Sequence, residues 1–369
     1  MHSSKKIIAR PGVEVSGRIR VPGDKSISHR ALMIGALADG RTRIRGFLPG
    51  EDCLATLAAL RTLGVQIDTT DPDCIVVEGV GLHGLRAPLA PLDMGNSGTG
   101  MRLLAGILAG QPFATELTGD DSLRRRPMER VAGPLRDMGA TVETTNGKPP
   151  VRITGRALKP IDYTSPVASA QVKSAILLAG LFASGDTRVT EPGISRDHTE
   201  RMLETFGAEI SYGNRVATIH GPGHLTACDV SVPGDLSSAA FALGAGCLAT
   251  GAGLSVAGVG INPTRTGVLD ILRKEPVATL RVEPSRLHGV EIPERLIPLA
   301  IDELPLVFAL AACADGTTVV SGAEELRHKE SDRIAVMAAG LRKLGIEVEE
   351  RADGALIHGG QLRSGVVDS

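Results

Sequence analysis

Polar and basic residues that could bind an anion gather at the beginnings of Ala- and Leu-rich stretches. Lys25, Ser26 and Arg30 open the first stretch, and Ser26 and Arg30 are four residues apart, which places them on one helix face. The start of an α-helix has free backbone N–H groups and the positive end of the helix dipole, so it attracts phosphates and carboxylates. Helix capping is the ordinary alternative for Ser26, but capping does not require Lys25 and Arg30 at the same end. The cluster therefore favours an anionic ligand.

Two later stretches of the same type begin with similar residues. These residues are Asn96, Ser97, Gly98 and Thr99 in the second stretch, and Ser169 and Gln171 in the third. For Ser97 or Thr99 alone, ordinary capping is the better explanation. The three openings together predict a shared site.

Charged residues nearer the C-terminus could complete that site. Lys329 and Arg333 are four residues apart, where like charges repel on a helix. Glu330 and Asp332 could offset that repulsion, so a charged helix start explains these residues as well as a ligand site does. Asp302 and Glu303 begin the fifth Ala- and Leu-rich stretch, in the otherwise apolar segment IPLAIDELPLVFALAA. A carboxylate at this position could cap a helix, or it could face a ligand as a proton acceptor.

The charge balance of the whole chain indicates that positive charge is concentrated locally. The chain has 40 basic and 42 acidic residues, which argues against a nucleic-acid-binding protein with a broad basic face. Arg124, Arg125 and Arg126 form a basic run before Pro127. A solvated run is the ordinary interpretation, which we keep for Arg124 and Arg125.

An internal repeat sets the architecture. One unit is an Ala/Leu-rich helix followed by a glycine and a short β-branched strand, and its glycines are Gly40, Gly110, Gly185, Gly251 and Gly316. The intervals of 70, 75, 66 and 65 residues are too regular for chance. We predict that each glycine follows its helix in the left-handed conformation.

A second unit ends an amphipathic helix with Leu, two residues, an apolar residue and Gly. Its copies read LRTLGVQI, LRDMGATV, LETFGAEI and LRKLGIEV. The copy due at Leu272 reads LRKEPVAT, so a segment is predicted to be missing at the Lys274–Glu275 junction. A sixth Ala/Leu-rich helix is due beyond Ser369.

These units predict an α/β protein with two domains, each an inside-out β/α barrel. The first-unit helices are apolar nearly all round, which is typical of helices buried on every side, whereas the second-unit helices carry charge on one face. Val-Pro-Gly-Asp occurs at 21–24 and again at 232–235. We interpret the two copies as crossings between a continuous domain, 23–235, and a second domain made of 1–22 plus 236–369.

Composition predicts a soluble cytoplasmic protein that contacts neither membrane nor nucleic acid. The five cysteines are widely separated and have no metal-ligand spacing, which is typical of reduced thiols. The residues MHSSKK lack the apolar part of a signal peptide, and no apolar run is long enough to span a membrane. Aromatic residues make up 2% of the chain, which implies closely packed elements with small side chains.

Eight segments resemble successive signatures of the 5-enolpyruvylshikimate-3-phosphate synthase (EPSP synthase) family. They are PGDKSISHRALMIGALA, GNSGTGMRLL, SLRRRPMERV, ASAQVKSAILLAGL, SRDHTERML, NPTRTG, IPLAIDELP and ELRHKESDRIAVM, in order over residues 20–345. One such segment would be a weak match, but eight in order are highly specific. The family fold has three β/α units per domain, with buried helix N-termini facing the interdomain cleft, which agrees with the repeats.

The resemblance implies a reaction and its participants. The enolpyruvyl group of phosphoenolpyruvate is transferred to the 5-hydroxyl of shikimate 3-phosphate through a tetrahedral ketal phosphate, and phosphate is released. This reaction serves chorismate and aromatic amino acid biosynthesis and is the target of glyphosate. It implies no metal and no organic cofactor, and the family is typically monomeric.

The resemblance also assigns roles to residues of this chain. The implied shikimate 3-phosphate ligands are Lys25, Ser26, Arg30, Ser169, Gln171, Ser195, Asp302 and Lys329. The implied phosphoenolpyruvate ligands are Lys25, Asn96, Gly98, Arg126, Gln171 and Arg333. Asp302 is the candidate base for the 5-hydroxyl, and Glu330 and Lys25 are candidates for moving the proton at C3.

Departures and rival hypotheses qualify the resemblance. The family pattern continues after Ser369 with a His/Asp-His-Arg element and a further Lys, so we expect residues beyond this sequence. A sister family transfers enolpyruvyl to UDP-N-acetylglucosamine, but it usually carries a cysteine in the loop matching 111–126, where this chain has none. A non-catalytic anion-binding protein would gain nothing from Asp302 and Glu330.

Gly98 retains the family's small residue, at which a methyl is linked to glyphosate tolerance. Leu103 replaces a proline common in sensitive forms, so glyphosate sensitivity stays open.

Overall fold

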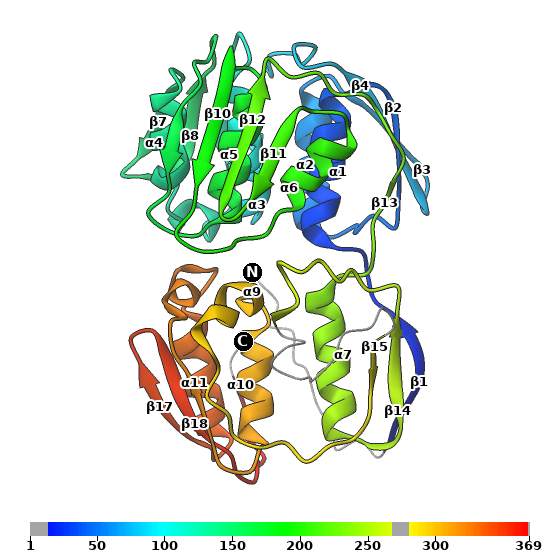
Figure 1. Ribbon diagram of the computed structural model, residues 1–369, viewed down its shortest axis with the longest axis vertical. Helices are drawn as coiled ribbons and strands as arrows, with labels where there is room; N and C mark the ends of the chain where they lie inside the picture. The colour runs from blue at the N-terminus through cyan, green and yellow to red at the C-terminus, as the bar shows by residue number, and fades with distance from the viewer. Residues whose placement is uncertain (1–13, 268–279, 368–369) are drawn as a thin grey trace.

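The computed structural model describes residues 14–267 and 280–367. These residues form two lobes, and the chain crosses between the lobes twice (Figure 1). The upper lobe runs from α1 (Lys25–Leu37) to β13 (Val230–Ser231), and the lower lobe contains β1 (Glu14–Arg20) and the chain from α7 (Leu236–Leu248) onward. The crossings coincide with the two Val-Pro-Gly-Asp segments. This position supports the domains that we propose, 23–235 and 1–22 plus 236–369.

Inner and outer helices of the upper lobe differ as their sequences predict. The inner helices, whose residues are nearly all buried, are α1, α3 (Gly98–Ala109) and α5 (Ala170–Gly180). The helices with an exposed polar face are α2 (Glu51–Thr62), α4 (Glu129–Asp137) and α6 (His198–Thr205). The buried helices contain mostly Ala, Leu, Ile and Gly because every face of them meets other protein.

Three four-stranded sheets enclose the inner helices of the upper lobe. The first sheet has the order β13, β2 (Asp39–Arg45), β4 (Cys74–Val80) and β3 (Gln66–Asp71). The second has the order β5 (Leu92–Asp93), β6 (Ala114–Thr118), β8 (Lys148–Thr154) and β7 (Thr141–Thr145). The third has the order β11 (Ile210–Gly213), β12 (Val216–Gly221), β10 (Gly185–Thr190) and β9 (Asp162–Thr164). In each sheet, the strand after the inner helix pairs antiparallel with a hairpin and parallel with a short strand.

The lower lobe repeats this plan with two three-stranded sheets in the part that the structure describes. The first consists of β1, β14 (Thr250–Ala257) and β15 (Leu280–Val282), and the second of β16 (Thr317–Val320), β18 (Gly354–His358) and β17 (Glu347–Arg351). In the described part of this lobe, the α-helices that follow α7 are α9 (Ile297–Ala300), α10 (Leu304–Ala312) and α11 (Arg333–Lys343). The order of inner helix, strand, outer helix and hairpin recurs at 25–80, 98–154, 170–221 and 304–358. The predicted repeat architecture is confirmed for these residues, whereas the Lys274–Glu275 junction lies outside the described residues.

Small side chains let the inner helices approach one another closely. A Cβ atom added to Gly106 on α3 would lie 2.1 Å from the carbonyl oxygen of Ala175 on α5. No side chain fits at that distance, so the crossing of α3 and α5 requires glycine. This closeness accounts for the scarcity of aromatic residues in the chain.

The glycines after the inner helices behave differently from our prediction. Gly40, Gly185, Gly251 and Gly316 have positive φ, but none directly follows its helix. The first three lie at the beginning of the following strand, and Gly316 immediately precedes β16. Gly110 has φ −90°, so the prediction is wrong at this position. Gly110 is required for space instead, because a Cβ there would lie 2.2 Å from Cγ of Phe182.

The left-handed position after a helix belongs to the glycines of the second unit. Gly64, Gly139, Gly207 and Gly345 have φ between 85° and 107° and directly follow the last residue of an outer helix or its cap. The next backbone N–H returns to the helix in each case, as Val65 does to the carbonyl oxygen of Leu60 at 3.0 Å. These glycines end the outer helices in the manner of a Schellman motif.

Burial of the inner helices is incomplete on α7, contrary to expectation. Phe241 is 60% exposed and Leu248 is 49% exposed. In the described residues, two sheets surround the inner helices of the lower lobe, against three in the upper lobe. Among the helices that the structure describes, none has the length and apolar character needed to cross a membrane.

Gly110→Ala should lower the free energy of unfolding by about 1–3 kcal/mol, because the added methyl overlaps the ring of Phe182. Gly360→Ala is the matched control, since a Cβ at Gly360 meets only Ile346, at 3.7 Å. We expect this control to change stability by about 0.5 kcal/mol or less. Urea unfolding measures both variants, and equal stabilities would show that Gly110 is not needed for packing.

Candidate active site

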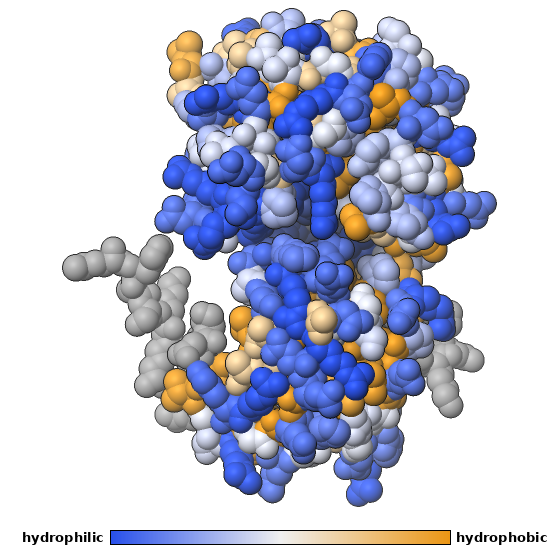
Figure 2. Space-filling view, turned by 90° about the vertical axis from the view of Figure 1, so that its left-hand side faces the viewer, coloured by the Kyte–Doolittle hydropathy of each residue, from blue (hydrophilic) through white to orange (hydrophobic). Residues whose placement is uncertain are grey.

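A cleft of about 500 Å³ lies between the two lobes, and both lobes line it. Figure 2 shows the surface narrowing and hollowed between the lobes, where the visible side chains are mostly hydrophilic. Its polar and charged lining from the upper lobe consists of Lys25, Ser26, Arg30, Thr99, Arg102, Arg126, Arg130, Ser169, Gln171, Ser195 and Arg196. The lower lobe contributes Asp235, Ser237, Arg265, Asp302, Glu325, His328, Lys329, Glu330 and Arg333. Among the described lining residues, nine are Lys or Arg and four are Asp or Glu, so the cleft is locally positive.

Helix N-termini from both lobes point at this cleft. First-turn residues of α1, α3, α5, α7, α10 and α11 all line it. Side-chain caps begin five of these helices, namely Asp24, Ser97, Ser169, Asp235 and Asp332. Ser97 is thus a cap, as predicted. The predicted orientation of the buried helices is confirmed, and their dipoles add to the positive potential of the cleft.

The predicted site residues come together at this cleft. Asn96 and Gly98 do not line it but lie behind Arg126. The guanidinium of Arg126 donates a hydrogen bond to Oδ1 of Asn96, and Asn96 donates from Nδ2 to Asp120 at 2.8 Å. A Cβ at Gly98 would lie 2.8 Å from Nη1 of Arg126, so glycine leaves room for this guanidinium.

Arg102 is a cleft residue that sequence reasoning missed. It donates from Nη1 to Oε1 of Gln171 at 2.5 Å and from Nη2 to the carbonyl oxygen of Pro127 at 3.0 Å. Burial, helped by the charges of Arg126 and Arg130, lowers the pKa of Arg102 to about 10, which still leaves it positive at neutral pH. The sequence feature that could have identified Arg102 is its position one helical turn after Gly98.

A buried carboxylate holds two of the predicted serine ligands. Glu191 accepts hydrogen bonds from the backbone N–H of Ser169 at 2.9 Å and from the hydroxyl of Ser195 at 2.8 Å. Lys173 lies 2.8 Å from Glu191 and 2.8 Å from Glu200. Lys173 offsets the negative charge of Glu191, so this carboxylate can lie next to a site that binds anions.

Arg30 has a structural role as well as its predicted ligand role. The side chain donates to Thr199 Oγ1 at 2.6 Å, to Ser174 Oγ at 2.8 Å and to the carbonyl oxygen of Ser26 at 3.0 Å. Arg30 is 3% exposed, and its burial lowers its pKa to about 10. These contacts tie α1 to α5 and α6 at the edge of the cleft.

Asp302 lies among three basic side chains. Its carboxylate is 2.5 Å from Arg196, 3.3 Å from Arg333 and 3.7 Å from Lys329. Burial acts to raise the pKa of Asp302, but these three charges outweigh burial and hold the pKa well below its usual range. Arg196, another residue missed at the sequence level, belongs to the upper lobe, so this ion pair joins the lobes.

Glu330 makes a second contact between the lobes. It pairs with Arg333 at 2.7 Å and with Arg126 at 3.6 Å. Burial acts to raise the pKa of Glu330, whereas its backbone hydrogen bond and the two guanidinium groups lower it, and the net result is a lowered pKa. Lys25 stands apart from these pairs, with its amine 3.2 Å from Asp52 and its side chain half exposed.

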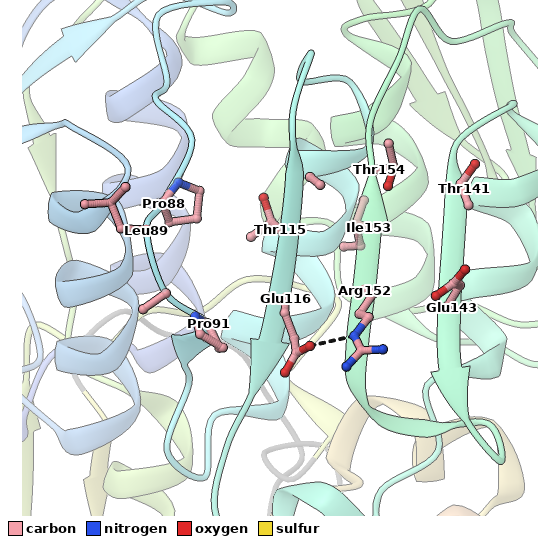
Figure 3. A pocket seen from close by; sticks show the side chains of 12 residues that line it. Pro88, Leu89, Pro91, Thr115, Glu116, Thr141, Glu143, Arg152, Ile153 and Thr154 are labelled. Carbon is pink, nitrogen blue, oxygen red and sulfur yellow. Dashed lines mark hydrogen bonds and ion pairs between the residues drawn. The ribbon is translucent and has the colours of Figure 1, made fainter.

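A second hollow lies on the upper lobe, beside β6, β7 and β8 (Figure 3). Its volume is about 330 Å³, and Pro88, Leu89 and Pro91 border it. Glu116 and Arg152, which are part of its lining, bond to each other at 2.7 Å. The cleft between the lobes, with its excess of basic groups, is therefore the candidate site for an anion.

The chain matches one protein family over nearly its whole length. The family described as EPSP synthase (3-phosphoshikimate 1-carboxyvinyltransferase) matches residues 9–369. A 3-phosphoshikimate 1-carboxyvinyltransferase from Acidithiobacillus ferrooxidans is 55% identical to this chain and is matched over 99% of the chain and 88% of its own length. The enzyme of that name from Methylococcus capsulatus is also 55% identical, over 100% of the chain and 89% of its own length.

Solved structures show the same similarity in three dimensions. An EPSP synthase from Acinetobacter baumannii has a TM-score of 0.82 and 50% identity, and the match covers 95% of this chain and 83% of that one. The enolpyruvyl transferase NikO from Streptomyces tendae has a TM-score of 0.74 at 21% identity, with the same coverages. The second match supports the fold alone.

Asp302→Asn should lower the free energy of unfolding at pH 6 by about 1–3 kcal/mol, because it removes charged hydrogen bonds to Arg196 and Arg333. The pKa of Asp302 is lowered in the folded state, so its stabilisation is present above the unfolded value of about 3.9 and is lost as the pH falls. The difference between wild type and variant should therefore shrink between pH 6 and pH 3.

Urea unfolding at both pH values measures this difference. Glu283→Gln is the control, because its partner Arg281 and Glu283 itself are both mostly exposed and the pair should contribute little at either pH. If the difference in free energy of unfolding between wild type and Asp302→Asn stays constant or grows toward pH 3, the assigned ion pairs are contradicted.

Proposed function

The chain belongs to the EPSP synthase family, and we propose that it carries out the family reaction in the cleft between its lobes. It is a 3-phosphoshikimate 1-carboxyvinyltransferase, which transfers the enolpyruvyl group of phosphoenolpyruvate to the 5-hydroxyl of shikimate 3-phosphate. The transfer releases phosphate and is a step of aromatic amino acid biosynthesis. The observation that supports this site is the convergence of Lys25, Arg126, Lys329 and Arg333 on one cleft with the helix N-termini.

The charges of the two substrates explain why so many basic residues are needed. Two phosphates and two carboxylates must meet in one small volume, and their repulsion has to be offset. Arginine suits both groups because its planar fork of donors matches a carboxylate or a phosphate. Basic groups already in place also stabilise charge that develops during the reaction.

We assign the two substrates to different parts of the cleft. Phosphoenolpyruvate would be held by Lys25, Asn96, Gly98, Arg126, Gln171 and Arg333. Shikimate 3-phosphate would be held by Lys25, Ser26, Arg30, Ser169, Gln171, Ser195, Asp302 and Lys329. Asn96 and Gly98 act behind Arg126, which they orient and accommodate. Glu191 supports the second group by fixing Ser169 and Ser195.

The reaction requires one proton to be added and another to be removed. Protonation at C3 of phosphoenolpyruvate and attack of the 5-hydroxyl on C2 give a tetrahedral ketal phosphate. Loss of phosphate, with removal of a proton from the new methyl group, gives the enolpyruvyl ether. We assign Asp302 as the base for the 5-hydroxyl, and Glu330 and Lys25 as the groups that move the proton at C3.

Substrate binding would make Asp302 a better base. In the described structure its proton affinity is reduced by Arg196, Lys329 and Arg333. A phosphate or carboxylate of a bound substrate would compete with Asp302 for these three cations, because positive charge attracts any anion. Once those cations contact substrate, Asp302 is stabilised less as a carboxylate and accepts a proton more readily.

Other expectations remain proposals. We propose that the enzyme acts in the cytoplasm, which the free thiols of its five cysteines support. We also propose that it is a monomer, as the family resemblance implies. Transfer to UDP-N-acetylglucosamine is not favoured, since the relatives over the full chain carry the shikimate name. A protein that only binds anions is not favoured for the same reason.

A phosphate-release assay tests the reaction and the role of Asp302. The full-length protein should release phosphate only when phosphoenolpyruvate and shikimate 3-phosphate are both present. Asp302→Ala should lower kcat about 100-fold or more, the usual contribution of a general base, with a smaller change in KM. Release with UDP-N-acetylglucosamine would indicate the sister reaction. An unchanged kcat would remove Asp302 from the mechanism.

Arg126→Ala should raise the KM for phosphoenolpyruvate roughly 10- to 100-fold, as expected for the loss of charged hydrogen bonds. Arg125→Ala is the matched control, because Arg125 is exposed, adjacent in sequence and not part of the cleft lining. Steady-state kinetics with each substrate varied in turn measures both. A selective effect of Arg126→Ala on shikimate 3-phosphate would reverse our assignment of the two subsites.

A further inference from the structure

The two Val-Pro-Gly-Asp segments lie against each other at the junction of the lobes. The backbone N–H of Asp24 donates to the carbonyl oxygen of Pro233 at 2.9 Å, and the N–H of Asp235 donates to that of Pro22 at 2.8 Å. Gly23 and Gly234 form an antiparallel bridge between them. The two crossings of the chain are thus joined by reciprocal hydrogen bonds and form one junction between the lobes.

Each aspartate of the pair begins an inner helix. Oδ1 of Asp24 caps α1 by accepting from the N–H of Ile27 at 2.9 Å, and Oδ2 of Asp235 caps α7 by accepting from the N–H of Ser238 at 3.0 Å. The remaining oxygen of each carboxylate binds Arg265. Nη1 of Arg265 donates to Oδ2 of Asp24 and, at 3.1 Å, to Oδ1 of Asp235. One guanidinium therefore joins the caps of two helices from different lobes.

The other end of the guanidinium reaches a third carboxylate. Nη2 of Arg265 lies 2.6 Å from Oγ of Ser237 and 3.4 Å from Oε1 of Glu303. Glu303 directly follows Asp302, and Asp24 directly precedes Lys25. Arg265 thus contacts the chain neighbours of two residues that we assign to the reaction, one from each lobe.

The loop that carries Arg265 also contacts the upper lobe elsewhere. Asn262 donates from Nδ2 to Oδ1 of Asp197 at 2.6 Å, and the hydroxyl of Thr264 lies 3.2 Å from the same oxygen. Asp197 directly follows Arg196, which pairs with Asp302 across the cleft. The loop belongs to the lower lobe, so these bonds seat it against the upper lobe beside the site.

Arg265 and the three carboxylates around it are all buried. Arg265 is 3% exposed, Asp24 4%, Asp235 8% and Glu303 1%. Buried charges are costly unless they are paired and hydrogen-bonded, and here three carboxylates face one guanidinium. Both terminal nitrogens of Arg265 are engaged by protein groups. These contacts favour a structural role for Arg265, whereas its buried Nε has no hydrogen-bond partner among the described residues.

We propose that Arg265 is a positioning residue for the reaction, which sets the separation of Lys25 and Asp302 by holding Asp24, Asp235 and Glu303 at the junction of the lobes. The proposal rests on the assignment of Lys25 and Asp302 under the proposed function. Arg265 fixes where α1 and α10 begin relative to each other, and the reacting groups at their ends follow. A displacement of about 1 Å between such groups can cost about 100-fold in rate.

Arg265→Lys tests the proposal in a chain that should still fold. Lysine keeps one positive charge among the carboxylates, but its single nitrogen cannot reach Asp24 and Glu303 together as two guanidinium nitrogens do. We expect kcat to fall about tenfold or more, with KM for each substrate changed less. Arg265→Met should lower kcat further and also lower the thermal midpoint.

Arg342→Lys is the matched control. Arg342 is also a lower-lobe arginine with more than one contact, since its Nε and Nη2 donate to the carbonyl oxygen of Val348 at 3.0 Å and 2.8 Å and its Nη1 lies 3.8 Å from Glu350, but it does not line the cleft. We expect Arg342→Lys to lower the thermal midpoint with kcat within about twofold of wild type.

The outcomes separate this proposal from the proposed function. Wild-type protein that releases phosphate, with Arg265→Lys equally active, overturns the positioning role and leaves the function intact. A fall in kcat that only parallels the loss of thermal midpoint in both lysine variants also overturns it, since stability alone would then account for the effect. Wild-type protein without turnover on both substrates contradicts the proposed function itself.

Discussion

The cleft depends on holding many like charges close together in a protein that is nearly neutral as a whole. Arg102, Arg126 and Arg333 stand near one another and near several helix N-termini, and this repulsion must be offset before any substrate arrives. Asp302 and Glu330 offset it in the described structure by pairing with these cations or their neighbours. Phosphates and carboxylates of bound substrates would then offset the repulsion among these basic groups. Under the proposed function, the carboxylates would then act in proton transfer, because the cations would no longer hold them ionised so strongly.

Close helix packing is what brings the positive groups to one place. The inner helices can converge only because small residues face each other where they cross, as Gly106 and Ala175 do. Wider side chains would separate the helix axes and move their N-termini apart. The aromatic-poor composition of the sequence agrees with this close packing of the inner helices.

Contacts between the lobes are concentrated at charged groups of the site. The pairs of Arg196 with Asp302, of Arg126 with Glu330 and of Arg265 with Asp24 all cross from one lobe to the other. Such pairs depend strongly on distance in a partly buried setting. The relative position of the lobes and the charge state of the site are therefore coupled, and substrate anions act on both.

Local patterns in the sequence determined the repeats, the inner and outer helices, and the helix ends that carry Lys25 and Gln171. They did so because burial on all sides, capping and turn glycines leave periodic marks in neighbouring residues. Only the tertiary structure decided which distant groups meet, such as Arg265 with Asp24, and why Gly110 must be small. Those contacts join residues far apart in the chain, and their energies depend on how repeats and lobes pack. Packing of this kind leaves no local pattern in the sequence. The sequence therefore identified residues of the site, whereas the fold determined which of them contact each other.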